Sequence, residues 1–271
     1  MHMDTTLLRG AGLPDIDPAR ILAEEPCPLL FATVSGAHLY GFPSRDSDVD
    51  LRGVHVLPPE DLVGLRQPEE TRSRMWDHDG VEMDLVTHDL RKFVRLMLKP
   101  NGYVLEQLLS PLVVHTTPLH EELAALAPTV LTRHHAHHYR GFAGTQWRLY
   151  ERTGELKPLL YTFRALLTGI HLMRTGTLVA HLPTLAGEVS APAFLPALIE
   201  AKADAEHGAA HMVDAASAAR DVAALHTVLD EAQAQSRLAE TPSGFDALHD
   251  LVVRVRLGSP ALSGGGASGG L

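Results

Sequence analysis

The chain has 271 residues, enough for one large domain or two of ordinary size, and its 33 acidic and 23 basic residues give a formal net charge of −10. This charge argues against a protein that coats nucleic acid through bulk electrostatics. The single cysteine, Cys27, excludes a disulfide framework and a Cys-x-x-Cys zinc site. No apolar run approaches the roughly 20 residues of a membrane span, and Met1–Asp4 does not begin a signal peptide, so we expect a soluble, cytoplasmic protein with no membrane partner.

Three segments in the first third of the chain carry strand patterns. One is an apolar run that ends at a Ser-Gly pair and two are alternations of polar and apolar residues: Leu29–Val34, Asp48–Leu57 and Val81–Thr87. Apolar residues at helical spacing follow in Leu90–Leu98, and Val104–Leu109 is predicted as another short helix.

Beyond Pro111 the strand patterns stop and helices are predicted. They cover Glu121–Leu126, Thr132–Arg152, Lys157–Arg174, Ala193–Ala216, Ala218–Leu238 and Phe245–Arg256. Residues 258–271 are rich in Gly and Ser and are predicted to form a disordered tail. The fold class is therefore predicted as α+β, with a small mixed β-sheet and flanking helices in residues 1–115 and an α-helical bundle domain in residues 116–257.

The first alternating strand brings two carboxylates together. Because side chains on a strand point to alternate faces, Asp48 and Asp50 share one face. They repel each other unless a cation lies between them, and Mg²⁺ prefers such oxygen ligands. Asp-x-Asp alone also describes two solvated carboxylates. A metal site is favoured by the Gly36 turn, which lets backbone N–H groups approach a triphosphate, and by a later strand with Glu82 and Asp84 on one face.

These residues belong to a longer pattern. Ser35-Gly-Ala-His-Leu-Tyr-Gly41 precedes Ser47-Asp-Val-Asp-Leu-Arg-Gly53, and His88-Asp-Leu-Arg-Lys-Phe93 and Asn101…Val104-Leu-Glu106 follow. The set resembles the signature of the DNA polymerase β-type nucleotidyltransferase superfamily, and more closely that of a bacterial group of nucleotidyltransferases. The resemblance covers residues 28–110 well and the helical half loosely.

The resemblance implies an enzyme that transfers NMP from an NTP to an acceptor hydroxyl and releases pyrophosphate. Asp48 and Asp50 would bind two Mg²⁺ or Mn²⁺ ions, and Asp84 would bind the catalytic one, with Glu82 as its rival. The nucleotide would be bound by residues of the glycine turn, a strand and a later helix: Ser35, Gly36, Ala37, His38, Tyr40, Arg52, Lys157, Tyr161 and Arg164. For Tyr40, stacking on a base and burial in the core remain equal alternatives.

One position departs from the superfamily pattern. Where most members carry a Ser that contacts the terminal phosphates, this chain has Ala37. The missing hydroxyl favours an alternative function, a degenerate nucleotide-binding or regulatory module that binds nucleotide without transferring it.

Two helices carry polar faces that suit phosphate or solvent alike. On the first, three cations repeat every four residues: Arg91, Arg95 and Lys99. On the second, Lys157, Tyr161 and Arg164 share a face that we expect to close over nucleotide or acceptor, with Lys157 and Arg164 contacting phosphate. A solvent-facing polar helix is the alternative in both cases.

The helical half shows a second, weaker resemblance. Arg164 and His171 fit the loose Arg-x4–6-His pattern of HEPN domains, as do Arg133 and His138, but Ala165 replaces the polar residue that usually follows the HEPN Arg. Two hypotheses stay open: a HEPN-like bundle alone, or a fused nucleotidyltransferase–HEPN ribonuclease of toxin–antitoxin type.

The segment from Arg133 to His138 contains four histidines, some at the i, i+3 and i, i+4 spacing of zinc ligands. Because no carboxylate or Cys stands nearby as a third ligand, a histidine patch at a domain interface or a pH-sensitive surface is favoured over a metal site. The expected partners are an NTP and an acceptor that is an RNA or DNA end, a protein hydroxyl or a small molecule. A homodimer formed through the helical domain is a further expectation.

Overall fold

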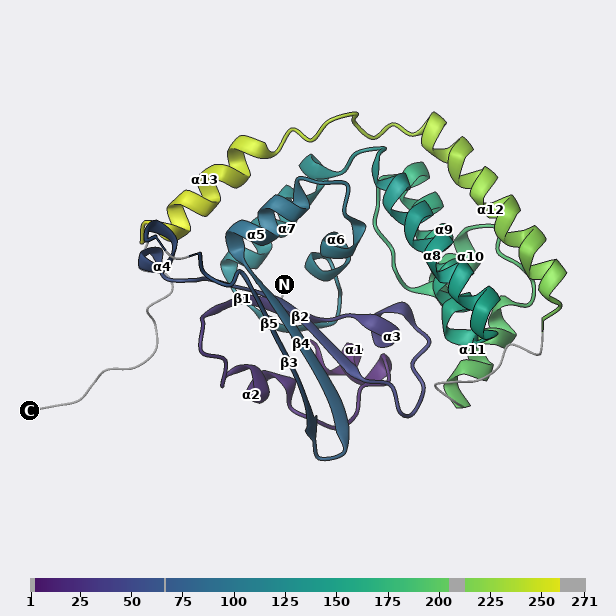
Figure 1. Ribbon diagram of the computed structural model, residues 1–271, viewed down its shortest axis with the longest axis horizontal. Helices are drawn as coiled ribbons and strands as arrows, with labels where there is room; N and C mark the ends of the chain where they lie inside the picture. Colours follow the sequence, from purple (N-terminus) through teal and green to yellow (C-terminus); the bar gives the residue numbers. More distant parts are fainter. Residues whose placement is uncertain (1–2, 66, 205–212, 259–271) are drawn as a thin grey trace, which may run out of the picture.

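The structure, a computed structural model, describes residues 3–65, 67–204 and 213–258. Of the predicted disordered tail, residues 258–271, all but Gly258 lie outside the described residues. The described chain forms two parts side by side, one built on a β-sheet and the other on helices (Figure 1).

The strands of the described residues form one mixed sheet of five strands, in the order β3-β4-β2-β1-β5. Their bounds are β1 Leu29–Val34, β2 Val49–His55, β3 Thr71–His78, β4 Val81–Asp89 and β5 Val113–Thr116. β2 runs parallel to β4, and the other neighbouring pairs are antiparallel. Because parallel strands align their corresponding ends, side chains near the start of β2 and of β4 meet at the same level of the sheet.

The mixed sheet confirms the predicted fold class, but two of its strands do not follow from the sequence pattern. β3 is an edge strand, and most of its side chains are exposed. Because neither face of β3 is buried, its sequence, with Arg72 and Arg74, lacks the polar–apolar alternation that marks a half-buried strand. β5 has only four residues and follows Pro111, where we predicted no further strand. That prediction is wrong because a short edge strand carries too few residues for a periodic signal.

Three helices cover one face of the sheet: α5 Leu90–Met97, α6 Gly102–Leu108 and α7 Pro118–Val130. Phe31 of β1 stacks on His120 of α7 at a centroid distance of 4.3 Å and meets Phe93 of α5 edge-on at 5.6 Å. Two residues further along β1, the Thr33 hydroxyl donates to the backbone oxygen of Gln107 in α6 at 2.8 Å. The face of the sheet that carries Phe31 and Thr33 is therefore the face on which these helices pack.

Short helices complete the sheet-bearing part: α1 Thr5–Gly10, α2 Pro18–Leu22, α3 Gly36–Tyr40 and α4 Pro59–Val63. α3 begins directly after β1, and all five of its residues are buried. The glycine turn of the sequence motif is thus a strand-to-helix corner inside the core.

The helical part consists of α8 His135–Thr153, α9 Leu156–Thr175, α10 Leu182–Glu188, α11 Leu195–Asp204 and α12 Ala215–Gln235. α9 lies at its centre and contacts the other four helices, which explains why most of its residues are buried. α10 was not predicted. α11 is described from Leu195 to Asp204, inside the predicted helix 193–216, and residues 205–212 of that prediction lie outside the described residues. We find no described helix with the length and apolarity needed to cross a membrane.

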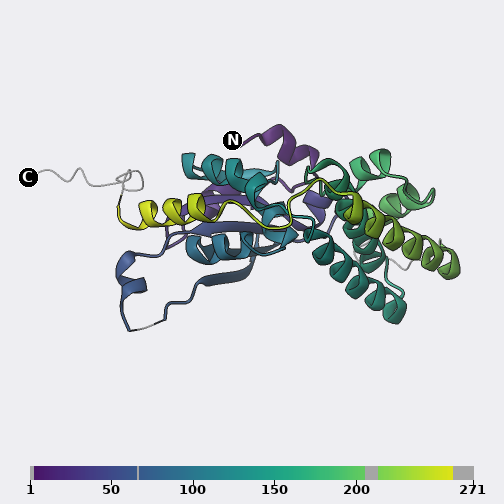
Figure 2. The same ribbon diagram turned by 90° about the horizontal axis from the view of Figure 1, so that it is seen from above.

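The last described helix, α13 Phe245–Arg256, returns to the sheet-bearing part, at the far end from α12 (Figures 1 and 2). The Arg256 guanidinium donates to both carboxylate oxygens of Asp89, which is fully buried at the end of β4. Asp89 also accepts from the backbone N–H of Leu57. α7 and α13, which we expected within a helical domain of residues 116–257, therefore pack with the sheet instead.

Candidate active site

Two aspartates on neighbouring strands form the centre of the candidate site. In the parallel pairing of β2 with β4, Asp50 lies directly opposite Asp84. Their side chains are partly exposed, at 25% and 21%. Glu82, the rival of Asp84, precedes the first residue pair that joins the two strands and is exposed. The register therefore brings Asp84, and not Glu82, beside Asp50.

Between the two aspartates lies the guanidinium of Arg52. Its Nη2 atom donates to Asp50 Oδ1 at 2.6 Å and to Asp84 Oδ2 at 2.8 Å. Nη1 donates to the backbone oxygens of Leu51 at 2.9 Å and Asp84 at 2.7 Å, and Nε donates to the Tyr103 hydroxyl at 3.1 Å. A guanidinium has five N–H groups, so every donor of Arg52 is used.

The other oxygen of Asp50 faces the start of α3. Gly36 has a φ of +63°, and a Cβ at this position would lie 1.8 Å from Asp50 Oδ2. Only glycine both adopts this conformation without strain and leaves room for the carboxylate. The motif glycine thus brings the strand-to-helix corner into contact with the aspartate pair.

Opposing effects act on the pKa of Asp50. Burial raises the pKa of Asp50 above its ordinary value, the Arg52 charge lowers it, and the charges of Asp84 and Asp48 raise it again. Lys157, from α9 in the helical part, also lowers this pKa. A cation from each part of the molecule therefore stabilises the carboxylate.

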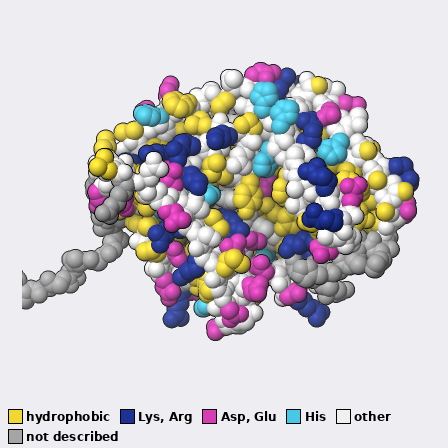
Figure 3. Space-filling model, viewed as in Figure 1, with side chains coloured by type: hydrophobic (Ala, Val, Ile, Leu, Met, Phe, Trp, Pro, Cys, Tyr) yellow, Lys and Arg dark blue, Asp and Glu magenta, His cyan; other side chains and the backbone are white. Residues whose placement is uncertain are grey.

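A cavity of about 700 Å³ opens beside Asp48 and Glu82, the neighbours of Asp50 and Asp84 in the sequence. Its wall includes His38, Asp48, Glu82 and Lys157, together with the loop residues 44–47. The volume is within the range of small-molecule sites, roughly 300–1,000 Å³. In the space-filling view the surface is hollowed between the two parts, with acidic side chains below the middle of the face and Lys and Arg side chains to their right (Figure 3).

The residue types suit a hard divalent cation, since carboxylate oxygens are the ligands that Mg²⁺ prefers. The arrangement, however, differs from the expected cluster of three carboxylates. Across residues 3–65, 67–204 and 213–258, no group of three or more His, Cys, Asp or Glu is placed to hold a metal ion. Asp50 and Asp84 converge on Arg52, whereas Asp48 precedes β2 and lines the cavity. Metal binding by Asp48, Asp50 and Asp84 therefore stays a prediction.

His38 closes the cavity on the side of α3. Its Nδ1 atom lies 3.0 Å from the backbone oxygen of Ala11, and because a carbonyl only accepts, Nδ1 carries a hydrogen. Burial lowers the pKa of His38, although Asp50 and Asp48 oppose this effect. The ring is therefore neutral at pH 7 and serves as a wall of the site.

Comparison with known proteins identifies the family. Residues 16–254 match RlaP, the RNA repair pathway DNA polymerase beta family. The chain belongs to this family. The predicted membership of the DNA polymerase β-type superfamily is thereby confirmed.

Two relatives of the RlaP chain show similarity over shorter stretches. The uncharacterized protein MJ0002 of Methanocaldococcus jannaschii is 34% identical over 153 residues, which cover 54% of this chain and 61% of that protein. The uncharacterized protein YcgL of Bacillus subtilis is 34% identical over 87 residues, or 32% of each chain. The matched stretches thus span less than two thirds of either relative. The match to a nucleotidyltransferase-like protein of Exiguobacterium sibiricum covers 88% of this chain and 78% of that protein at 11% sequence identity, with a TM-score of 0.32.

In this RlaP member, two of the expected nucleotide contacts form a buried network instead. Arg164 Nη1 donates to Glu106 Oε1 at 2.6 Å, and the Tyr40 hydroxyl donates to Glu106 Oε2 at 3.0 Å. The Arg164 guanidinium also lies 3.9 Å from the centroid of the Tyr40 ring. Arg164 was expected to contact phosphate, but its side chain is 3% exposed and already neutralised by Glu106. The buried alternative for Tyr40 is the one observed.

Three further expected contacts also lie away from the cavity wall. Ser35 and Ala37 are buried at the corner between β1 and α3, so Ser35 does not replace the hydroxyl that Ala37 lacks. Tyr161 packs edge-on against Tyr40 and Phe42 at 5.5 and 5.4 Å. Of the predicted nucleotide-binding residues, His38 and Lys157 line the cavity, while Gly36 contacts Asp50 and Arg52 bonds to Asp50 and Asp84.

The remaining polar patterns have structural partners. Arg91 and Arg95 of α5 both donate to Glu70, whereas Lys99 is exposed. His171 Nδ1 lies 3.2 Å from Glu188, so the Arg164–His171 pair does not form an exposed ribonuclease site.

The histidines near the start of α8 have a carboxylate beside them that the sequence pattern did not indicate. His134 Nε2 lies 3.1 Å from Glu240 Oε2, and the His134 ring stacks on that of His137 at a centroid distance of 5.8 Å.

Sequence reasoning missed Lys202. This residue of α11 is fully buried, and its ammonium donates to the Ser44 hydroxyl at 2.8 Å. Ser44 in turn is bonded to Ser47, next to Asp48. The helical part thus anchors the loop that precedes the aspartates. A lysine in an Ala-rich helix carries no pattern that would have revealed this burial.

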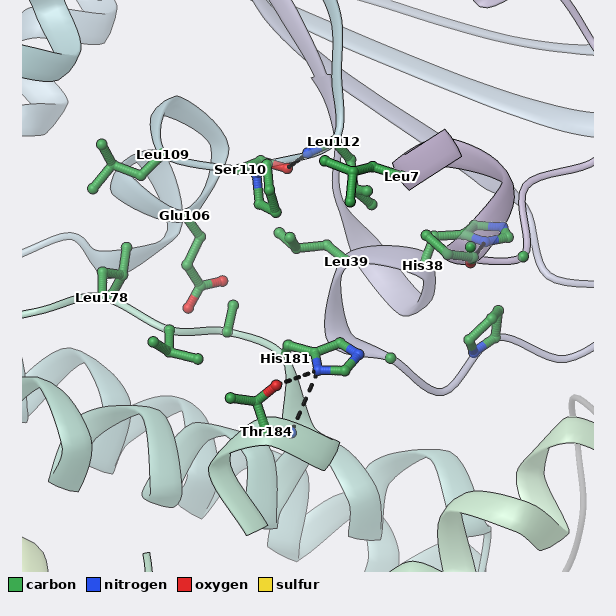
Figure 4. A pocket seen from close by; sticks show the side chains of 18 of the residues that line it. Leu7, His38, Leu39, Glu106, Leu109, Ser110, Leu112, Leu178, His181 and Thr184 are labelled. Atoms are coloured by element: carbon green, nitrogen blue, oxygen red, sulfur yellow. Dashed lines mark hydrogen bonds between the residues drawn. The ribbon is translucent and has the colours of Figure 1, made fainter. Parts of the chain in front are cut away.

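A second cavity, of about 810 Å³, lies on the other side of α3 (Figure 4). Leu7, Leu39, Leu109 and Leu178 line it from four separate segments, and His181 bonds to Thr184 at its edge. Its wall is mainly apolar, which distinguishes it from the charged cavity beside Asp48.

Proposed function

We propose that this RlaP member transfers NMP from an NTP to an acceptor hydroxyl and releases pyrophosphate. The observation that carries the proposal is the in-register pair Asp50 and Asp84, held beside the Gly36 corner and next to a cavity of nucleotide size. In such a transfer the acceptor oxygen bonds to the α-phosphorus while the bond from that phosphorus to the pyrophosphate oxygen breaks.

The side chains around the cavity have distinct roles in this proposal. Asp48 and Asp50 would hold Mg²⁺ or Mn²⁺, which would neutralise triphosphate charge and lower the pKa of the acceptor hydroxyl. Lys157 attracts the triphosphate, because it lines the cavity from the opposite part of the molecule. Asp84 is bonded to Arg52 through Oδ2 and accepts the acceptor's proton through its other oxygen.

For the acceptor, we propose the 3′-hydroxyl end of an RNA. The description of the family refers to RNA repair, and the net charge of −10 disfavours a long duplex held by bulk electrostatics. An RNA end places a single hydroxyl at the cavity without requiring a basic face along the whole molecule.

The test uses the full chain, radiolabelled NTPs, Mg²⁺ or Mn²⁺, and an RNA oligonucleotide with a 3′-hydroxyl. An oligonucleotide that ends in a 3′-phosphate is the matched acceptor control. We expect label on the hydroxyl-ended RNA alone, and Asp84→Asn to lower the rate about 100-fold or more. Asp61→Asn, an exposed aspartate on α4, is the control variant. Equal labelling by wild type and Asp84→Asn would contradict the proposal.

One observation favours a second function, in which the protein binds nucleotide without transferring it. Ala37 and the buried Ser35 leave the corner after β1 without a hydroxyl that reaches the cavity. This alternative predicts saturable NTP binding together with no pyrophosphate release for RNA, DNA or protein acceptors. Release of pyrophosphate with any of these acceptors would reject it.

A further inference from the structure

We propose that the Tyr103 hydroxyl binds the nucleotide by donating a hydrogen bond to a non-bridging oxygen of its α-phosphate. Arg52 holds the hydroxyl in place for this contact. The inference rests on the proposed function for the position of the α-phosphate, since NMP transfer brings the reacting phosphorus to Asp50 and Asp84. It assigns a substrate contact to a residue that the sequence pattern did not single out.

Tyr103 stands next to the aspartate pair. Its hydroxyl accepts from Arg52 Nε at 3.1 Å, and Nη2 of the same guanidinium donates to Asp50 at 2.6 Å and to Asp84 at 2.8 Å. Nε–H and one N–H of Nη2 point along the same edge of a guanidinium, so the hydroxyl and an aspartate oxygen are neighbours on that edge. Tyr103 is 38% exposed, so it is open to a ligand that binds at the aspartates.

The hydroxyl has one hydrogen to donate. A phenol oxygen accepts through its lone pairs, and the bond from Arg52 uses one of these. Among the residues that the structure describes, none accepts the hydroxyl hydrogen of Tyr103. Ionised Asp50 and Asp84 only accept, and all five N–H groups of Arg52 are already bonded. The hydroxyl hydrogen is therefore the donor that these four side chains leave for a ligand.

A donor at this place suits an anionic oxygen. The two carboxylates repel a phosphate, and the non-bridging oxygens of a phosphate accept hydrogen bonds. Because the Tyr103 oxygen accepts from a cation, its O–H bond is polarised and donates more strongly. The charge of Arg52 thus acts on the ligand through the hydroxyl, although the guanidinium itself has no N–H left to donate.

The backbone of Tyr103 is fixed on both sides. Its N–H donates to the side chain of Asn101 at 3.2 Å, where α6 begins. A Cβ at Gly102 would lie 2.4 Å from the Tyr139 hydroxyl, so the start of α6 packs closely on α8. A group that is already held in place loses little conformational freedom when it binds a ligand.

The test measures the affinity of the full-length chain for nucleotides with Mg²⁺ and no acceptor. Whichever of ATP, GTP, CTP and UTP binds most tightly is compared with its two α-thio diastereomers, in which sulfur replaces one or the other non-bridging oxygen. Tyr103→Phe removes only the hydroxyl. We expect it to weaken the binding of the NTP and of one diastereomer about tenfold, as for the loss of a hydrogen bond to a charged group. The affinity for the other diastereomer should not change, because its sulfur accepts hydrogen bonds poorly.

Tyr150→Phe is the matched control, because Tyr150 lies near the end of α8 and packs against Trp147. It should leave all three affinities unchanged. Equal weakening of all three nucleotides by Tyr103→Phe would show that the hydroxyl only holds Arg52, and three unchanged affinities would show that it makes no contact. Either result overturns the inference, and so does a wild type that binds no NTP. The expected pattern of binding without NMP transfer would reject the proposed function and keep this inference.

Discussion

Arg164 on α9 and Glu106 on α6 form an ion pair, with Nη1 and Oε1 2.6 Å apart and both side chains almost fully buried. The pair joins the helical part to the sheet-bearing part. A second residue of the sheet-bearing part, Tyr40, bonds the same carboxylate. The contact between the two parts is therefore polar at its centre, although apolar side chains surround it.

Breaking this pair should destabilise the protein strongly. Glu106→Ala leaves the Arg164 charge buried without its counter-ion, which typically costs about 3–5 kcal/mol in unfolding free energy. Chemical denaturation followed by circular dichroism measures the loss. The control is the exposed pair Arg254–Glu122, where Glu122→Gln should cost less than about 1 kcal/mol. Similar losses for both substitutions would show that Arg164 is not structural and would reopen a role in phosphate contact.

Gly36 should tolerate no side chain. Gly36→Ala places a Cβ 1.8 Å from Asp50 Oδ2 at a φ of +63°, so the corner or the carboxylate must move. We expect both a lower melting temperature and a loss of Mn²⁺ binding. Gly80→Ala is the matched control, because Gly80 also has a positive φ, +84°, but has nothing within 4 Å of the added Cβ. It isolates the backbone strain, about 1 kcal/mol, and should leave Mn²⁺ binding intact.

Much of this site follows from local pattern, and the rest depends on pairing between distant segments. Buried β1 is predicted at its observed bounds because a strand covered on both faces is a continuous apolar run. Strand alternation and the family motif together single out Asp50 and Asp84. The parallel register that brings them face to face joins residues 34 positions apart, and no local pattern encodes it.

The placement of the charged side chains shows the same limit. Arg52 stands two residues after Asp50, so its location on the acidic face follows from alternation, but its bonds to Asp84 and Tyr103 do not. Arg164 and Lys202 have helix spacings that suit a solvent-facing side chain equally well. Only the packing of α9 and α11 against the sheet-bearing part buries them. The expected homodimer through the helical part stays a prediction.

Lys157 should contribute to nucleotide affinity more than to stability. It lines the cavity from α9, and its charge acts on Asp50, so Lys157→Gln removes a cation from the proposed triphosphate site. We expect NTP to bind about tenfold more weakly, as for the loss of one charge-assisted hydrogen bond, with little change in melting temperature. Lys99→Gln, at an exposed position two residues after the end of α5, is the control. Titration of a fluorescent NTP analogue measures both, and equal affinities would remove Lys157 from the site.

Stability should fall as the pH is lowered from 6.5 toward 4. Burial lowers the pKa of His55, and separately that of His135, from 6.5 to about 4. In this window the unfolded chain binds protons that the folded chain excludes, so the unfolding free energy decreases as the pH falls. The full shift corresponds to about 3 kcal/mol for each histidine, present above pH 6.5 and lost by the folded pKa. Denaturation midpoints at several pH values should show a shallower slope for His55→Gln than for the wild type. The exposed His249→Gln should keep the wild-type slope, and an unchanged slope for His55→Gln would contradict the assignment.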